Sequence, residues 1–276
     1  MAYGRPKPRS RGRDRGLLRG GKPRPPRFAA GPHGARTRAG ETVLLYGWHT
    51  VISALENPRR RIRNLKVTDN ALRRLAAAGI RLPVEPERVR PDEIAARLGP
   101  DAVHQGLLAE ADPLAAPEIE TLAPDGIVLA LDQITDPHNV GAILRSAAAF
   151  AVRAVVTTAR HSPEATGVLA KSASGALEHV PIVTVQNLAR ALTALRERGF
   201  RIIGLDSGGE RELAEASLGA PLALVLGAEG KGLRQSTRAN CDIVARLDLP
   251  GAIKSLNVSN AAALALYIAT HEPAGV

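Results

Sequence analysis

Residues 247–267 read LDLPGAIKSLNVSNAAALALY. A turn at Pro250 and Gly251 precedes an Ala/Leu segment that predicts a helix running to about Thr270. Four small polar residues fall within six positions at the start of that helix: Ser255, Asn257, Ser259 and Asn260. Read alone, the stretch fits an ordinary capped helix, since Ser and Asn accept the first unpaired backbone N–H groups. One cap needs only one such residue, so the surplus favours a loop that binds something polar.

Upstream of this stretch, short apolar runs alternate with helical segments. The run from Ile127 to Leu131 is continuously apolar, which is typical of a strand buried on both faces. Five more strands are predicted at residues 154–157, 182–185, 201–205, 222–226 and 243–247. Strands alternating with helices predict an α/β fold with a parallel or mostly parallel sheet. Ligands of such folds bind at the loops beyond the carboxyl ends of the strands.

Two other loops share that position with the loop at residues 247–257. Residues 132–145, DQITDPHNVGAILR, turn out of a strand into a helix that carries Asn139 and Arg145. Residues 227–232, GAEGKG, place Glu229 among three glycines, which allows a close approach between backbone and ligand. The loop at residues 227–232 fits neither the phosphate-binding nor the dinucleotide-binding glycine pattern. Each loop also has a purely structural interpretation. The first would be a helix cap followed by a surface Arg, and the second would be a loop with a hydrogen-bonded carboxylate.

The N-terminal half predicts a smaller α/β unit at residues 41–111. It has helices before Asn57-Pro58 and after Asp69, which we expect to cap the second of them. No catalytic cluster stands out in this half, so it is better suited to binding than to chemistry. Residues 112–125 contain three prolines and predict a linker to a second domain at residues 126–276.

The net charge of +10 is concentrated at the start of the chain. Residues 1–40 hold twelve Lys or Arg and one acid, giving +11, whereas the remaining 25 basic and 26 acidic residues give −1. This Arg/Pro/Gly-rich stretch has little to bury, so we expect a disordered basic tail that captures a polyanion by releasing counterions. A solubilising or targeting tail is the alternative.

Composition excludes several other classes of protein. No run approaches the roughly 20 apolar residues of a membrane span, and the seven His show no metal-ligand spacing. Cys241 is the sole cysteine, which excludes an internal disulfide and favours a buried thiol in a reducing compartment. We therefore expect a cytoplasmic protein without membrane or metal.

The three loops, in this order, resemble the motifs of the SpoU family of RNA ribose 2′-O-methyltransferases. The segments that carry the resemblance are DPHNVGAILRSA from Asp136, LGAEGKGL from Leu226 and SLNVSNAAALALY from Ser255. Upstream, YGWHTVISAL from Tyr46 and HQG at residues 104–106 are similar to the small RNA-binding domain of the branch that modifies a guanosine in large-subunit ribosomal RNA. One departure is LDL at residues 247–249, where the family often has an Ile-Pro-Met-like stretch.

The resemblance implies a SPOUT-type α/β domain with a trefoil knot and a mostly parallel sheet, joined to an L30e-like RNA-binding domain. It also implies a homodimer, ribosomal RNA as the partner and S-adenosylmethionine as the methyl donor. The residues implied for the cofactor are Gly227, Leu247 and Leu256, and those implied around the reacting ribose are Asn139, Arg145, Glu229, Ser255 and Asn257. A guanidinium suits the stabilisation of a developing alkoxide better than general base catalysis, because its reference pKa above 12 leaves little neutral form at pH 7.

Three interpretations remain open at this point. The leading one is methylation of a guanosine ribose in large-subunit ribosomal RNA. The substrate could instead be tRNA or another nucleotide of ribosomal RNA. The chain could also be a non-catalytic RNA-binding factor for ribosome assembly, although such a factor would not need Asn139, Arg145, Glu229 and Asn257 together. A nicotinamide dehydrogenase is remote, because the glycine fingerprint is missing.

Overall fold

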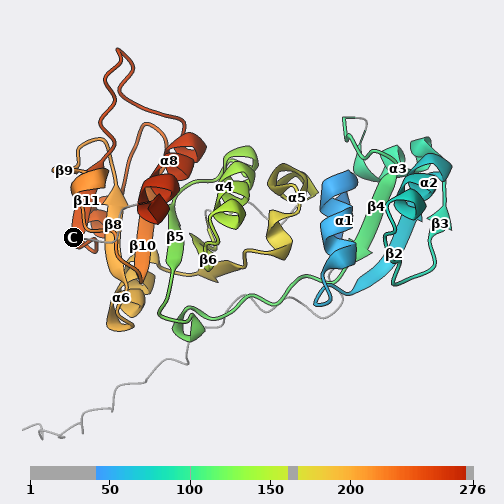
Figure 1. The fold of residues 1–276 in the computed structure, drawn as a ribbon, viewed down its shortest axis with the longest axis horizontal. Coiled ribbons are helices and arrows are strands. Elements are labelled where there is room, and N and C mark those ends of the chain that lie inside the picture. Colours follow the sequence, from blue (N-terminus) through green and yellow to red (C-terminus); the bar gives the residue numbers. More distant parts are fainter. Residues whose placement is uncertain (1–41, 100, 161–166, 272–276) are drawn as a thin grey trace, which may run out of the picture. The chain divides into compact units, whose positions relative to one another are not determined.

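A computed structural model describes residues 42–99, 101–160 and 167–271, which form two sheets with their helices (Figure 1). The basic tail predicted at residues 1–40 lies outside the described residues. Within the described ranges, no helix combines the length and apolar character that a membrane crossing requires.

The first sheet has four strands in the order β1-β4-β2-β3. Its elements, in chain order, are β1 Val43–Tyr46, α1 Trp48–Glu56, β2 Ile62–Val67, α2 Asp69–Ala77, β3 Glu87–Arg88, α3 Pro91–Leu98 and β4 Leu107–Ala111. β4 pairs antiparallel with both β1 and β2. The sequence correctly predicted a small α/β unit here, but Thr68 rather than Asp69 caps α2, because the Thr68 side chain accepts the Ala71 N–H.

The second sheet has seven strands in the order β7-β6-β5-β10-β8-β11-β9, and each neighbouring pair in the described residues is parallel. Its strands are β5 Ile127–Asp132, β6 Ala154–Thr158, β7 Ile182–Val185, β8 Arg201–Leu205, β9 Arg211–Glu212, β10 Leu222–Gly227 and β11 Ile243–Arg246. The helices are α4 Pro137–Ala149, α5 Gly167–Ala173, α6 Leu188–Glu197, α7 Gln235–Arg238 and α8 Val258–His271, and short 3₁₀ turns lie at Ile119–Thr121, Ala176–Glu178 and Leu213–Glu215. The predicted parallel α/β fold is confirmed.

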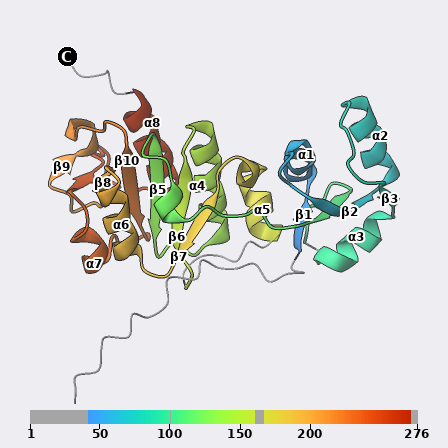
Figure 2. The ribbon, with the colours of Figure 1, turned by 90° about the horizontal axis from the view of Figure 1, so that it is seen from below.

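Both faces of this sheet are buried, as the apolar strands predicted. Alternate side chains of a strand point to opposite faces. Leu129 and Leu131 of β5 therefore join the core beneath α4 and α8, whereas Val128 and Ala130 join the core beneath α6. Figure 2 shows α8 and α6 on opposite sides of the strands. A sheet covered on both faces leaves its strand ends as the places where polar side chains can meet a ligand.

The carboxyl ends of β5, β10, β8 and β11 lie along one edge, because these four strands are parallel neighbours. At the centre of this edge, Asp132 of β5 is in register with Gly227 of β10. The three loops singled out in the sequence follow β5, β10 and β11, so the fold brings them to the same edge.

A buried ion pair links the turn before β2 to the 3₁₀ turn Ala176–Glu178. The side chains of Arg60 and Glu178 are 4% and 2% exposed, and Arg60 Nη2 lies 2.6 Å from Glu178 Oε1. Arg60 Nη1 also donates to the carbonyl of Asp112, and Asn57 Nδ2 donates to Glu178 Oε2 at 2.7 Å. The charges are thus well compensated, which a buried ion pair requires to be tolerated.

Replacing Glu178 with Ala should lower the free energy of unfolding by about 3–5 kcal/mol, because it leaves the Arg60 guanidinium buried without a counter-charge. Urea denaturation measures the change. The matched control is Asp125→Ala, which breaks the exposed pair with Arg153 and should cost no more than about 1 kcal/mol. An equal decrease in the free energy of unfolding in the two variants would contradict the conclusion that the buried pair contributes more to stability than the exposed one.

Candidate active site

The loop after β5 presents Asn139 at the start of α4. Asp136 is the N-cap of this helix, and its carboxylate accepts the backbone N–H groups of His138 at 3.2 Å and Asn139 at 3.3 Å. Pro137 occupies the first helical position, where its missing N–H costs nothing. The capped, Pro-started turn fixes the direction in which the half-buried Asn139 leaves the helix.

A hydrogen bond joins this helix start to the loop after β11. Asn257 Nδ2 donates to Asn139 Oδ1 at 3.0 Å, across 118 positions of sequence. The other end of the Asn257 amide is also held, because its Oδ1 accepts the Ser259 N–H at 2.9 Å and the Ser259 hydroxyl at 2.6 Å. Asn257 therefore has two roles: its side-chain oxygen caps α8, and its side-chain nitrogen links this loop to the loop after β5.

The loop after β10 folds back over its own strand. Ala228 forms an isolated antiparallel bridge with Gly232, and a Cβ on Gly227 would overlap the carbonyl group of Gly232. Gly232 itself has a φ of +64°, and a Cβ there would overlap the side chain of Asp206. Only glycine fits at both positions, so the glycines of this loop are required by backbone packing.

Two carboxylates hold the loop in this shape. Asp206, directly after β8, accepts the backbone N–H of Leu233 at 3.0 Å and that of Gly208 at 2.9 Å. Asp132, which is fully buried at the end of β5, accepts from the backbone N–H and Nε of Arg234 at 2.9 and 2.6 Å. Neither acid was predicted from the sequence as part of the site. The available signal was the position of each, immediately after an apolar strand.

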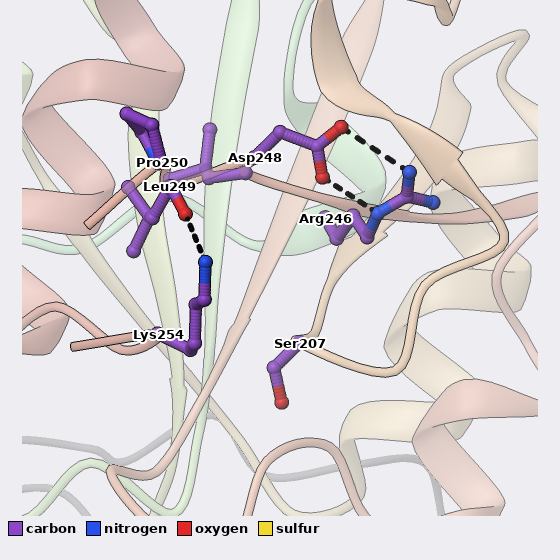
Figure 3. Close-up of a pocket in the computed structure, with 7 residues that line it drawn as sticks. Ser207, Arg246, Asp248, Leu249, Pro250 and Lys254 are labelled. Atoms are coloured by element: carbon purple, nitrogen blue, oxygen red, sulfur yellow. Dashed lines mark hydrogen bonds and ion pairs between the residues drawn. The ribbon is translucent and has the colours of Figure 1, made fainter. Parts of the chain in front are cut away.

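A pocket of about 550 Å³ opens beside the ends of β8 and β11 (Figure 3). Its lining includes Leu247, which was predicted to contact the cofactor, and the charged side chains of Arg246, Asp248 and Lys254. Arg246 Nε donates to Asp248 Oδ1 at 2.7 Å, and this hydrogen bond, with the attraction between the two charges, raises the pKa of Arg246. Lys254 Nζ donates to the carbonyl of Leu249 at 2.8 Å. The pocket thus presents charges of both signs beside apolar side chains.

The remaining predicted residues lie near these loops without being joined to one another. Arg145, Glu229 and Ser255 are exposed, and in the described part of the chain no hydrogen bond or ion pair connects them to Asn139 or Asn257. Leu256 is 36% exposed, and neither it nor Gly227 lines the pocket. A single chain therefore assembles the two asparagines and the loop that carries Leu247, and leaves the guanidinium of Arg145 facing solvent.

The model of the SpoU rRNA methylase family matches residues 126–267, and that of the RNA 2′-O ribose methyltransferase substrate-binding domain matches residues 44–117. This chain belongs to the SpoU rRNA methylase family. The 23S rRNA (guanosine-2′-O-)-methyltransferase RlmB of Ralstonia nicotianae is 39% identical over 84% of this chain and 96% of that protein. The protein of the same name from Pseudomonas aeruginosa is 38% identical over 81% and 94%.

Solved structures of the family share the fold. The SpoU methyltransferase AviRb of Streptomyces viridochromogenes, in complex with the cofactor AdoMet, superimposes with a TM-score of 0.70. It is 25% identical, and the match covers 87% of this chain and 93% of that chain. The resemblance found in the three loops is confirmed at the level of the family. Among the residues the structure describes, no group of three or more His, Cys, Asp or Glu is placed to hold a metal ion.

Replacing Asp206 with Ala should loosen the loop after β10, because the Leu233 and Gly208 amides lose their acceptor. Hydrogen–deuterium exchange in peptides covering residues 207–209 and 229–234 should become faster by several-fold. Exchange in the core strand β5 should stay as slow as in the parent protein. Unchanged exchange in both loop peptides would show that Asp206 does not hold the loop.

Proposed function

We propose that this protein transfers a methyl group from S-adenosylmethionine to a ribose 2′-oxygen, that of a guanosine, in large-subunit ribosomal RNA. The observation that carries the proposal is the Asn257–Asn139 hydrogen bond, which brings the first and third family motifs together at one sheet edge. The names of the two relatives favour ribosomal RNA over the tRNA alternative. We also place the activity in the cytoplasm, which fits a chain with a single cysteine.

The residues at this edge fit the cofactor. We assign Gly227 to the cofactor through its backbone groups, since Gly232 fills the space beside its Cα, and Leu247 offers an apolar contact in the lining of the pocket. S-Adenosylmethionine carries an α-ammonium and an α-carboxylate, and the pocket offers Asp248 for the former and Lys254 for the latter. Leu256, in the exposed part of the same loop, would close over the bound molecule. When bound, the cofactor supplies an electrophilic methyl group on a positively charged sulfur.

The side chains around the ribose then have two tasks. A ribose hydroxyl is a weak nucleophile. As its oxygen bonds to the methyl carbon, the bond from that carbon to sulfur would break, a neutral thioether would leave, and the hydroxyl proton would pass to solvent, so negative charge develops on the oxygen in the transition state. Asn139 and Asn257, held to each other, position the hydroxyl in line with the methyl group. Arg145 stabilises the developing alkoxide and clamps the neighbouring phosphate through its planar fork. Glu229 and Ser255 orient Arg145 and the hydroxyl.

We propose a homodimer in which the partner subunit completes each site. Arg145 is exposed in the single chain, and α8 exposes Leu264 at 38% and Tyr267 at 53%. The loop before α8 adds Ile253, which is 77% exposed. Apolar side chains in this number on one segment favour a protein interface. We further propose the trefoil knot of the family, formed where the loop at residues 247–257 leads into α8.

Arg145→Ala and Asn257→Ala should each reduce methyl transfer by at least about 100-fold, because each removes a group that acts on the reacting oxygen. The measurement is single-turnover transfer of labelled methyl to ribosomal RNA fragments. S-Adenosylmethionine binding, followed by calorimetry, should change less than about threefold. Arg145→Lys serves as the matched control, since it keeps the charge and loses the fork, and it should retain partial activity. Normal turnover in both alanine variants would refute the assigned roles.

Deleting residues 1–40 should weaken RNA binding and flatten its salt dependence. The tail carries twelve of the 37 basic residues, and each phosphate it neutralises contributes roughly 0.7–0.9 to the slope of log K against log salt. Fluorescence anisotropy with labelled RNA between low and physiological salt measures this slope. An unchanged slope would favour the solubilising or targeting role for the tail.

Tyr267→Glu should convert the dimer into monomers, because it places a charge in the proposed interface. Light scattering coupled to size exclusion gives the mass of each species. Methyl transfer should fall together with dimerisation, since the partner completes the site. Glu120→Lys, which changes an exposed charge in the segment between the two sheets, is the control. A fully active monomer would contradict the proposal that the site needs two chains.

A further inference from the structure

We infer that a second pocket, which methyl transfer does not use, holds one unpaired nucleotide of the RNA, with its base against Trp48 and its edge contacted by Gln105. This inference rests on the proposed function, because it takes RNA as the substrate. The pocket, called here the Trp48 pocket, measures about 170 Å³. Six of its lining residues carry the inference: Trp48, His49, Val103, Gln105, Lys171 and Ser174.

The size and chemistry of the Trp48 pocket suit a single ring. At roughly 30 Å³ per water, it has room for about five or six waters, which is also the scale of one flat heterocycle. Its lining combines an indole, an amide, an imidazole and an ammonium group, and contains no Asp or Glu. A planar ligand that carries negative charge matches this set. A nucleotide has both properties.

Two cations lie against aromatic side chains at this place. The guanidinium carbon of Arg74 lies 3.9 Å from the centre of the half-buried Trp48 ring, and Lys171 Nζ lies 5.8 Å from that of Tyr46, whose own ring is buried and so does not contact a base. An accessible aromatic ring with Arg and Lys beside it is the combination on which an unpaired base stacks while its phosphate is neutralised. Val103, at 60% exposure, adds an apolar side chain at the rim.

The backbone around the pocket is held in conformations that side-chain-bearing residues avoid. Gln105 has a φ of +53° and Ser174 a φ of +49°, and both line the pocket. Gln105 is fixed further because its Oε1 accepts the backbone N–H of Trp48 at 2.8 Å. Within the described residues its Nε2 makes no hydrogen bond, so it can donate to a carbonyl oxygen on a base edge. Such locally strained positions concentrate at binding sites.

Trp48 is the single tryptophan of the chain, so its fluorescence reports directly on this pocket. The full-length protein is titrated with a single-stranded 12-nucleotide purine RNA, with the same RNA in a duplex, and with a polyglutamate peptide. We expect saturable quenching by the single strand and little by the duplex or the peptide. Equal quenching by the duplex or the peptide would overturn the inference, since neither offers an unpaired base.

Gln105→Glu tests the contact without removing the Trp48 ring. The new carboxylate can still accept the backbone N–H of Trp48. The substitution removes the Gln105 side-chain N–H donor and adds a negative charge, so the affinity for the single strand should fall about threefold or more. Gln186→Glu makes the same change at an exposed position after β7 and should have no effect. The Trp48 variants lack the fluorophore, so their affinities are measured by the anisotropy of the labelled single strand: Trp48→Ala should weaken binding on the order of tenfold, and Trp48→Phe should restore most of it.

The two proposals fail in different ways. Equal affinities for the Gln105→Glu and Gln186→Glu variants, with methyl transfer intact, would overturn the nucleotide pocket alone. Saturable quenching by the single strand without methyl transfer from the parent protein would overturn the proposed activity alone. Calorimetry with S-adenosylmethionine on each variant confirms that the cofactor site is undisturbed.

Discussion

The parallel pairing of the large sheet determines where polar side chains can meet a ligand. β5, β10, β8 and β11 run in the same direction and are covered on both faces, so their side chains are committed to two apolar cores. Chemistry is then possible only at the strand ends, and parallel strands put all their carboxyl ends on one edge. The three family motifs are far apart in the sequence and meet at this edge for that reason.

The loops at the edge are shaped by acids that do not themselves belong to the motifs. Asp132 and Asp206 each end or follow a strand and accept backbone N–H groups from the loop after β10. A buried carboxylate that accepts such hydrogen bonds holds a loop more firmly than apolar packing alone, because leaving it unpaired would be costly. Gly227 and Gly232 then allow the backbone to pass where any side chain would collide. Rigid placement of this kind is what a reaction between two positioned substrates needs.

The two pockets serve different kinds of recognition. The pocket beside β8 and β11 has charges of both signs, which suits a small zwitterionic cofactor. The Trp48 pocket combines residues of the N-terminal unit with Lys171 and Ser174, holds no acid in its lining, and suits the base of a nucleotide. The Trp48 pocket would then bind the RNA at a nucleotide other than the one that is methylated. Mutations there should change the affinity for RNA without changing the rate of methyl transfer on bound RNA.

The sequence by itself determined the fold class, the family and the loops that form the site. The fold class could be predicted because continuous apolar strands permit few arrangements, and the family because three polar motifs follow such strands in a fixed order. The sequence could not show that Asn257 bonds to Asn139, that Asp206 supports the loop after β10, or that Arg60 and Glu178 form a buried pair. These contacts join residues 27 to 118 positions apart, and a sequence pattern records local periodicity but not distance in space. Only the tertiary structure decided them.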